Sequence, residues 1–318
     1  MALAQQQIQT QKQTLVFRHI LAAVDFSPAS KKALSEALAL TASNDAHLSV
    51  VHVLQPDWRY EMLGNPPEID LEQIDAHRRL QKFIDELYPG QKIESIHVKH
   101  GPIAQTILSV AGDTTADLIV VGTHGRGGIS KFALGSVAEE LLRIAACPVM
   151  TIGPRTAAET LKQETAIRTI LFATDFGAGS AKALSLAVKL AQAHQAKLIL
   201  VHMIPPMPAT SASLSAYAPA TAAADELQEW EAGCKKRALQ QLKECLPAGS
   251  ALEQEPEYVV GTDFLPEGVL TAAAKFNVAL IVMGTNRTGA ARLAAHIPWT
   301  AVHEVLANAP CPVLTVAE

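Results

Sequence analysis

Residues 117–136 read Asp117-Leu-Ile-Val-Val-Gly122-Thr-His-Gly125-Arg-Gly-Gly-Ile-Ser-Lys-Phe-Ala-Leu-Gly135-Ser136. The unbroken apolar run at the start predicts a buried parallel strand, because such strands are covered on both faces. Small residues follow, and Gly135-Ser136 predicts the start of a helix. Glycine lets a ligand approach the backbone closely, and the first N–H groups of a helix attract anions. The stretch therefore predicts a strand–loop–helix unit with an anion site, although a glycine-rich connection without a ligand fits the same residues.

The sequence contains a tandem repeat of one unit. The segment 18–26 recurs as 168–176, and the strand 118–122 recurs as 280–284. The offset between matched motifs grows from 150 residues at the start to 164 residues at Cys147 and Cys311. The second copy therefore carries extra residues, and we place most of them in the Pro/Ala/Ser-rich stretch 204–224. A repeat of this length is a duplicated domain.

Each copy alternates β and α elements, which predicts an α/β fold with parallel strands and helices on both faces. In the first copy we expect strands over 47–54, 92–99 and 118–121, and an amphipathic helix over 71–87. Ser27 and Pro28 predict the N-cap and the first turn of the helix after the first strand. The predicted domains are a flexible tail (1–14), a first domain (15–153), a linker (154–167) and a second domain (168–318).

Composition excludes several classes of protein. The 318 residues carry a formal net charge of −5, which argues against a broad nucleic-acid surface. No apolar run has the length of a membrane span, and the glutamine-rich start lacks the core of a signal peptide. The four cysteines form no C-x-x-C pair, so we expect reduced thiols and a cytoplasmic location.

The spacing G-x2-G-x9-G-S, formed by Gly122, Gly125, Gly135 and Ser136, resembles that of the nucleotide-binding universal stress proteins. The resemblance covers residues 16–317 in tandem, and other phosphate-binding loop motifs are absent. It implies two tandem five-stranded parallel sheets of strand order 3-2-1-4-5, similar to the adenine-nucleotide alpha-hydrolases. The first domain would be the nucleotide-binding one.

The resemblance also implies an ATP site where the first and fourth strands end, a place where α/β sheets bind ligands. Asp25 would contact the ribose and adenine region, and Val53 would meet adenine. The other site positions implied are Gly122 and Gly125 in the turn, Gly135, Ser136 and Val137 at the phosphates, and Ala23, Val24 and Val121 in the lining. Several of these residues have a structural alternative. Asp25 and Ser136 suit helix caps, Val53 suits any sheet, and His52 and His202 suit hydrogen-bonded core positions.

The second copy departs from this pattern. Asp175 matches Asp25, but Trp299 and Thr300 stand opposite Gly135 and Ser136, and Arg287 stands opposite Gly125. A tryptophan would fill the space that the phosphates need. We therefore expect a degenerate phosphate loop in the second domain and one working site per chain.

Three functions fit these features. The first is an ATP-binding stress-response regulator, with or without magnesium, in which the nucleotide acts as a conformational or partner switch. The second is a slow ATPase or self-phosphorylating enzyme, for which His124 is the clearest base. The third is a scaffold or small-ligand binder in which Leu214, Tyr217 and Trp299 of the second domain cover a pocket.

The expected partners are an adenine nucleotide and an unidentified protein, with no nucleic acid and no membrane. The apolar segments 149–152 and 313–316 come last in each copy and should be edge strands, which tend to pair. They could join the copies as an intramolecular pseudo-dimer, and a further homodimer is left open.

Overall fold

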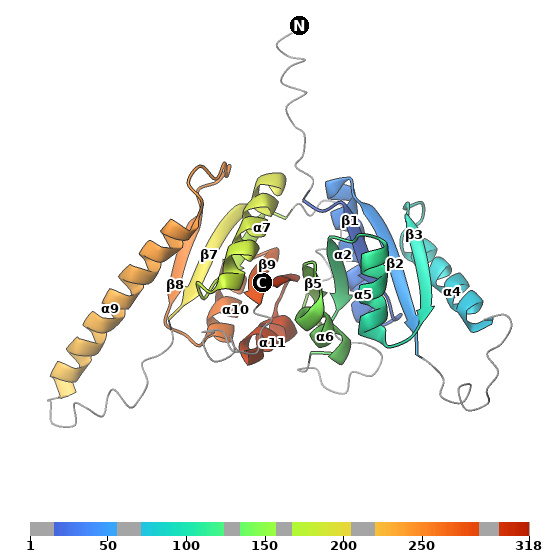
Figure 1. Ribbon diagram of the computed structural model, residues 1–318. Coiled ribbons are helices and arrows are strands. Elements are labelled where there is room, and N and C mark those ends of the chain that lie inside the picture. Colours follow the sequence, from blue (N-terminus) through green and yellow to red (C-terminus); the bar gives the residue numbers. More distant parts are fainter. Residues whose placement is uncertain are drawn as a thin grey trace, which may run out of the picture.

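The computed structural model describes residues 16–55, 71–123, 134–156, 167–204, 220–285 and 299–317. Two α/β halves lie side by side (Figure 1), the first half up to residue 156 and the second from residue 167. The first half contains β1 (His19–Ala23), α2 (Pro28–Asn44), β2 (His47–Leu54), α4 (Leu71–Leu87), β3 (Ser95–His100), α5 (Ile103–Asp113), β4 (Leu118–Gly122), α6 (Ser136–Ile144) and β5 (Val149–Ile152). The second half contains β6 (Thr169–Ala173), α7 (Ala178–His194), β7 (Lys197–Met203), α9 (Ala220–Cys245), β8 (Glu257–Gly261), α10 (Leu265–Lys275), β9 (Leu280–Thr285), α11 (Trp299–Asn308) and β10 (Val313–Ala317).

The strands form one ten-stranded sheet of order β3-β2-β1-β4-β5-β10-β9-β6-β7-β8. Each half has the predicted order of parallel strands, and the two five-stranded sheets join edge to edge through their last strands. β5 and β10 pair antiparallel, with Met150 opposite Leu314. The Thr315 hydroxyl also donates to the Val149 carbonyl at 3.0 Å. Each half would otherwise present an unpaired apolar edge, and the pairing removes both edges.

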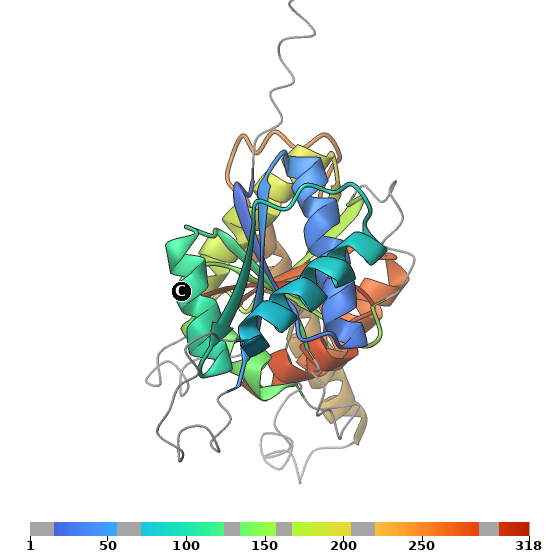
Figure 2. The same ribbon diagram turned by 90° about the vertical axis from the view of Figure 1, so that its right-hand side faces the viewer.

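Helices cover both faces of this sheet, as predicted (Figure 2). α2, α4, α7 and α9 pack on one face, and α5, α6, α10 and α11 pack on the other. Each face forms one apolar cluster that contains residues of both halves. Representative buried members are Leu34, Leu80, Leu184 and Leu242 on the first face and Ile107, Leu141, Val269 and Val305 on the second. The core is therefore continuous from one half to the other.

Capping explains where the helices begin. Ser27 is the N-cap of α2, as predicted, and its hydroxyl accepts from the Ser30 N–H at 3.1 Å. The alternative of Ser136 as a cap is wrong, because Gly135 is the N-cap of α6 and Ser136 is already helical. The α7 helix has Gly177 at its N-cap position and therefore no side-chain cap from that residue.

The extra residues of the second copy lengthen the helix before its third strand. The connections that precede α4 and α9 have equal lengths, whereas α9 has 26 residues and α4 has 17. The segment from α9 to β8 is also longer than that from α4 to β3. The buried residues Ala238 and Leu242 of α9 match Ala76 and Leu80 of α4 at an offset of 162 residues. The insertion therefore precedes Ala238 and includes the start of α9, and residues 205–219 of the expected stretch 204–224 lie outside the described residues.

Candidate functional site

The topology places a switch point, where α/β folds have a ligand crevice, at the carboxyl ends of β1 and β4. β1 pairs with β2 on one side and with β4 on the other. The chain continues from β1 to β2 and β3 and then crosses to β4. Connections that leave adjacent strands in opposite directions open a space where α/β proteins bind ligands. The predicted residues of the first half lie around this point.

Four predicted lining residues share one face of the sheet. Ala23 and Val121 are buried in the cluster under α5 and α6, and Val53 and Val137 pack against that cluster. Val24 belongs to the opposite cluster, under α2. The structure thus puts these four apolar side chains on the face of the sheet that α5 and α6 cover, and the side chain of Val24 on the other face.

Asp25 is held in place by the end of β2. The Val24 N–H donates to the Val51 carbonyl at 2.9 Å, and His52 Nδ1 donates to the Val24 carbonyl at 2.7 Å. Since a carbonyl only accepts, Nδ1 carries the proton of His52. His52 is buried, as the structural interpretation of this histidine predicts. The half-buried Asp25 carboxylate accepts from the Ser27 N–H at 3.0 Å.

The two ends of the glycine loop are tied together. The Thr123 N–H donates to the Ile152 carbonyl at 3.0 Å, and the Gly135 N–H donates to the Thr123 carbonyl at 2.7 Å. These bonds place the start of α6 directly beside the end of β4. Gly125, His124 and the rest of residues 124–133 lie outside the described residues.

The start of α6 offers N–H groups to an anion. The Glu139 N–H makes the first bond of the helix, to the Gly135 carbonyl at 2.9 Å. The three N–H groups before it, from Ser136 to Ala138, have no partner within the helix. Glu139 is an acidic residue in this first turn, so a cation that accompanies an anionic ligand would lower the local repulsion.

Gly122 has a packing role that the sequence does not reveal. A Cβ at this position would lie 2.8 Å from the backbone carbon and from the Cβ of Ala29 in α2. Gly284 is equivalent in the second half, and a Cβ there would lie 2.6 Å from the Gly179 backbone. Both strands therefore need glycine for the helix to approach, with or without a ligand.

The equivalent place in the second half is arranged differently. Asp175 accepts from the Gly177 N–H at 2.8 Å and from the Ser180 hydroxyl at 3.0 Å. Trp299 is the first residue of α11, but its side chain and the whole of Arg287 lie outside the described residues. His202 makes the same kind of hydrogen bond as His52, since its Nδ1 donates to the Thr174 carbonyl at 2.8 Å. This histidine–carbonyl hydrogen bond is thus common to both halves and does not indicate a ligand site.

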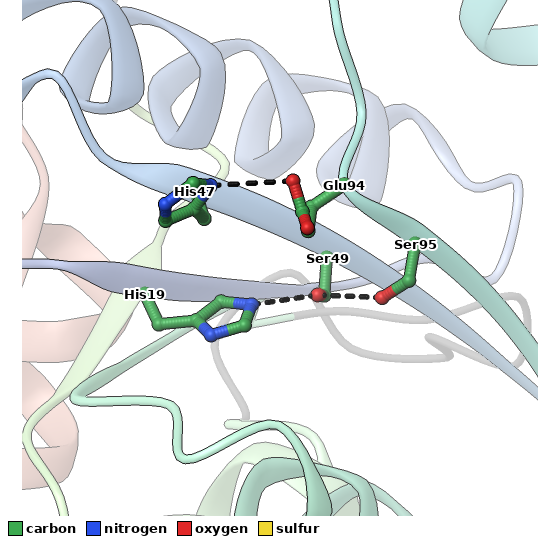
Figure 3. Close-up of polar contacts among 5 residues, drawn as sticks. All are labelled: His19, His47, Ser49, Glu94 and Ser95. Carbon is green, nitrogen blue, oxygen red and sulfur yellow. Dashed lines mark hydrogen bonds and ion pairs between the residues drawn. The ribbon is translucent and has the colours of Figure 1, made fainter.

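A second polar cluster lies at the opposite, amino-terminal ends of the first three strands (Figure 3). His19 Nε2 bonds to the Ser49 hydroxyl at 2.9 Å, and Ser49 bonds to Ser95 at 2.8 Å. His47 Nδ1 lies 3.2 Å from Glu94 Oε2. Ser49 is fully buried, so its bonds to His19 and Ser95 connect the strands in the interior, whereas the His47–Glu94 contact is exposed. Among the described residues, no group of three or more His, Cys, Asp or Glu side chains is placed to hold a metal ion.

Comparison with known proteins connects this geometry to a family. The model of the universal stress protein family matches residues 17–153 and again residues 166–317. The chain belongs to the universal stress protein family. This universal stress protein carries two copies of the family domain, as the repeat predicts. Within the described parts of the chain, no helix has both the length and the apolar character needed to cross a membrane.

Single-domain relatives match one half of this universal stress protein. Universal stress protein A homolog 1 of Coxiella burnetii is 38% identical over 141 residues, which are 43% of this chain and 96% of the relative. A universal stress protein of Thermus aquaticus is 32% identical over 139 residues, which are 43% of this chain and 99% of the relative. A solved universal stress protein from Archaeoglobus fulgidus matches both halves with a TM-score of 0.64, covering 95% of this chain and 97% of that one. Its 17% identity supports the fold alone.

Proposed function

We propose that this protein binds ATP, with or without magnesium, in its first half and acts as a regulatory switch in the stress response. One observation carries the proposal. At the switch point between β1 and β4, the start of α6 lies beside the end of β4, on the sheet face that carries the side chains of Ala23, Val53 and Val121. An apolar wall suits a base, and the helix start suits phosphates.

The residues present fit such a ligand. Ala23, Val53, Val121 and Val137 would contact the base, and Asp25 would accept hydrogen bonds from ribose hydroxyls. The N–H groups of Ser136 and Val137 would face phosphate oxygens. Gly122 adds little to the argument, because its packing against Ala29 already requires glycine. Gly125 remains a predicted contact in the turn.

The switch itself would need ATP to bind one conformation, or one complex with a protein partner, better than another. We place the protein in the cytoplasm, where free thiols such as its four cysteines persist. The halves would form an intramolecular pseudo-dimer through β5 and β10. Catalysis is not part of the proposal.

We propose one site per chain. Asp175, the partner of Asp25 in the repeat, is already bonded to Gly177 and Ser180. The residue equivalent to Gly135 is Trp299, whose side chain would occupy the place of the phosphates.

Calorimetric titration of nucleotide-stripped full-length protein with ATP and magnesium tests the proposal. We expect one site per chain, lost in Gly135→Trp and retained in Asp175→Ala. Gly135 has φ −66° and ψ 143°, an extended conformation open to any residue, so the variant fills the site without backbone strain. Two sites per chain would contradict the proposal of a single site and show that Trp299 does not block the second half. No binding at millimolar ATP would contradict the function.

A further inference from the structure

A hydrogen-bond network at the amino-terminal ends of the first three strands joins two histidines through two serines. His19 Nε2 bonds to the Ser49 hydroxyl at 2.9 Å, as Figure 3 shows, and Ser49 bonds to the Ser95 hydroxyl at 2.8 Å. Ser95 in turn bonds to His97 Nε2 at 2.8 Å. This serine–histidine network of four side chains links β1, β2 and β3, and it lies at the end of the sheet opposite the proposed nucleotide site.

The second half shows that the fold does not require the network. In the register of the repeat, Ile199 stands in the place of Ser49 and Val259 in the place of His97. β7 and β8 nevertheless pair in the same register as β2 and β3. A sheet of this kind thus forms with apolar residues at both places, and the polar side chains of the first half call for a separate explanation.

The number of hydrogens limits how the network can be bonded. Three hydrogen bonds need three hydrogens, and each serine hydroxyl supplies one. Within the described residues, neither hydroxyl makes a further hydrogen bond. The third hydrogen must therefore come from Nε2 of one histidine, and the other histidine must accept at Nε2. An imidazole that accepts is neutral, so the network is fully bonded only while at most one of its histidines is charged.

The surroundings of His97 favour its neutral form. Burial lowers the pKa of His97 most, and the charge of Lys99 lowers it as well. Asp113 raises this pKa, and His19 lowers it. Hydrogen donation therefore runs from His19 through the two serines to His97. The further titratable groups next to His19 are His47, with ring centroids 6.0 Å apart, its partner Glu94, and Asp117, which accepts from the His19 N–H at 3.1 Å.

A second charge disrupts the network. His97 in its neutral form carries its hydrogen on Nδ1, so a further proton has to enter at Nε2, where Ser95 donates. Both histidines would then donate, and one hydroxyl hydrogen would have no acceptor within the network. Ser49 is fully buried and Ser95 is half-buried, so the loss of this hydrogen bond is costly. The two charged rings would also repel each other.

We propose that the serine–histidine network is a proton sensor, which holds β2 and β3 together while at most one of its histidines is charged and loosens them when both are. The contribution of the network to stability is complete above the ordinary histidine pKa of 6.5, and it is lost as the pH falls and His97 takes up its proton. The second half lacks the network, so acidification acts through it on the first half alone. The inference does not depend on the proposed nucleotide site.

Titration of the histidine rings by NMR, in the full-length protein with and without Ser49→Ala, tests the inference. The ring signals are assigned with His19→Gln and His97→Gln. Alanine at position 49 cuts the network between its two histidines, and the second half shows that an apolar residue is compatible with the fold there. Ser95 can then accept from His97, so the midpoint of His97 protonation should rise by about one pH unit, a tenfold gain in proton affinity.

Amide hydrogen exchange of the same proteins shows whether protonation loosens the strands. Between pH 8 and pH 5, after correction for intrinsic exchange rates, the protection of β3 should fall by about threefold or more relative to that of β8, its equivalent. Ser49→Ala should abolish this difference. The control Ser43→Ala, which removes an exposed hydroxyl of α2, should retain both the difference and the His97 midpoint.

Two results would overturn the inference. One is a His97 midpoint that Ser49→Ala leaves unchanged, and the other is an equal loss of protection in β3 and β8 of the unaltered protein. Both measurements are made without nucleotide, so neither result would bear on the proposed binding of ATP.

Discussion

Glu36 is a buried carboxyl group without a charged partner in the described structure. It lies in α2 with 8% of its surface exposed, and its Oε1 has no hydrogen-bond partner among the described residues. Burial raises the pKa of Glu36 from 4.5 to about 7. Burial raises the pKa of the Tyr88 phenol and of the Cys311 thiol, and the negative charge of Glu36 raises both pKa values further. At the equivalent position the second half has Leu186.

This group should make stability depend on pH. Between pH 4.5 and about 7 the folded protein keeps a proton on Glu36 that the unfolded chain has lost, so the free energy of unfolding falls as pH rises. The total is about 3 kcal/mol, from the size of the pKa shift. Urea unfolding at pH 5 and pH 8 should show Glu36→Gln gaining stability over the unaltered protein at pH 8 alone.

The exposed Glu72, in the first turn of α4, provides the control for this experiment. Glu72→Gln should retain the pH dependence of the unaltered protein. An identical pH dependence in Glu36→Gln would show that Glu36 is not the responsible group.

The contact between β4 and α2 can be tested at Gly122, and its repeat between β9 and α7 at Gly284. Alanine at either position would push a Cβ against helix backbone at 2.8 or 2.6 Å. Overpacking of this kind destabilises by about 1–3 kcal/mol. Chemical denaturation should therefore show similar losses for Gly122→Ala and Gly284→Ala, although only the first lies at the proposed site.

Gly112 in α5 is the matched position for that comparison, because a Cβ there meets nothing within 4 Å. Alanine in a helix is favoured over glycine by about 0.5–1 kcal/mol, so Gly112→Ala should be neutral or stabilising. If Gly122→Ala kept full stability, packing against Ala29 would not be the reason for this glycine. Close approach of a ligand to the backbone would then be the remaining reason.

At the scale of elements, sequence patterns predicted most strands and helices because the repeat shows each pattern twice. The helix 71–87 and the strand 47–54 were predicted with the bounds that the structure has. The helix cap at Gly135, the length of α9 and the bond from Ser180 to Asp175 were not predicted, since each depends on local backbone geometry that the pattern of residue types does not fix. For the proposed site, the residue positions come from the sequence alone. The structure adds that the side chain of Val24 lies on the other face of the sheet from the other lining residues.

The whole molecule should unfold as one unit. One sheet and two apolar clusters run through both halves, so neither half can lose its core without exposing part of the other. Scanning calorimetry should give a single transition whose calorimetric and van't Hoff enthalpies agree.

The variant Val313→Asp tests the pairing of β5 with β10. It places a charge at a buried position of β10, opposite Thr151. It should split the transition in two, because an unpaired buried charge is strongly unfavourable. The control is Lys99→Asp on the exposed surface of β3, which should keep one transition. Two transitions in the unaltered protein would contradict the shared core.

The antiparallel joint of β5 and β10 also decides how the two halves can evolve. Were the same joint formed by two identical chains, every substitution would appear on both sides of it at once. A covalent tandem frees the two sides from this symmetry, and it keeps them paired at any dilution because their meeting is intramolecular. One half can then carry Ser27 while the other carries Gly177 at the same place in the repeat. The joint thus allows the two halves of one chain to take on different functions.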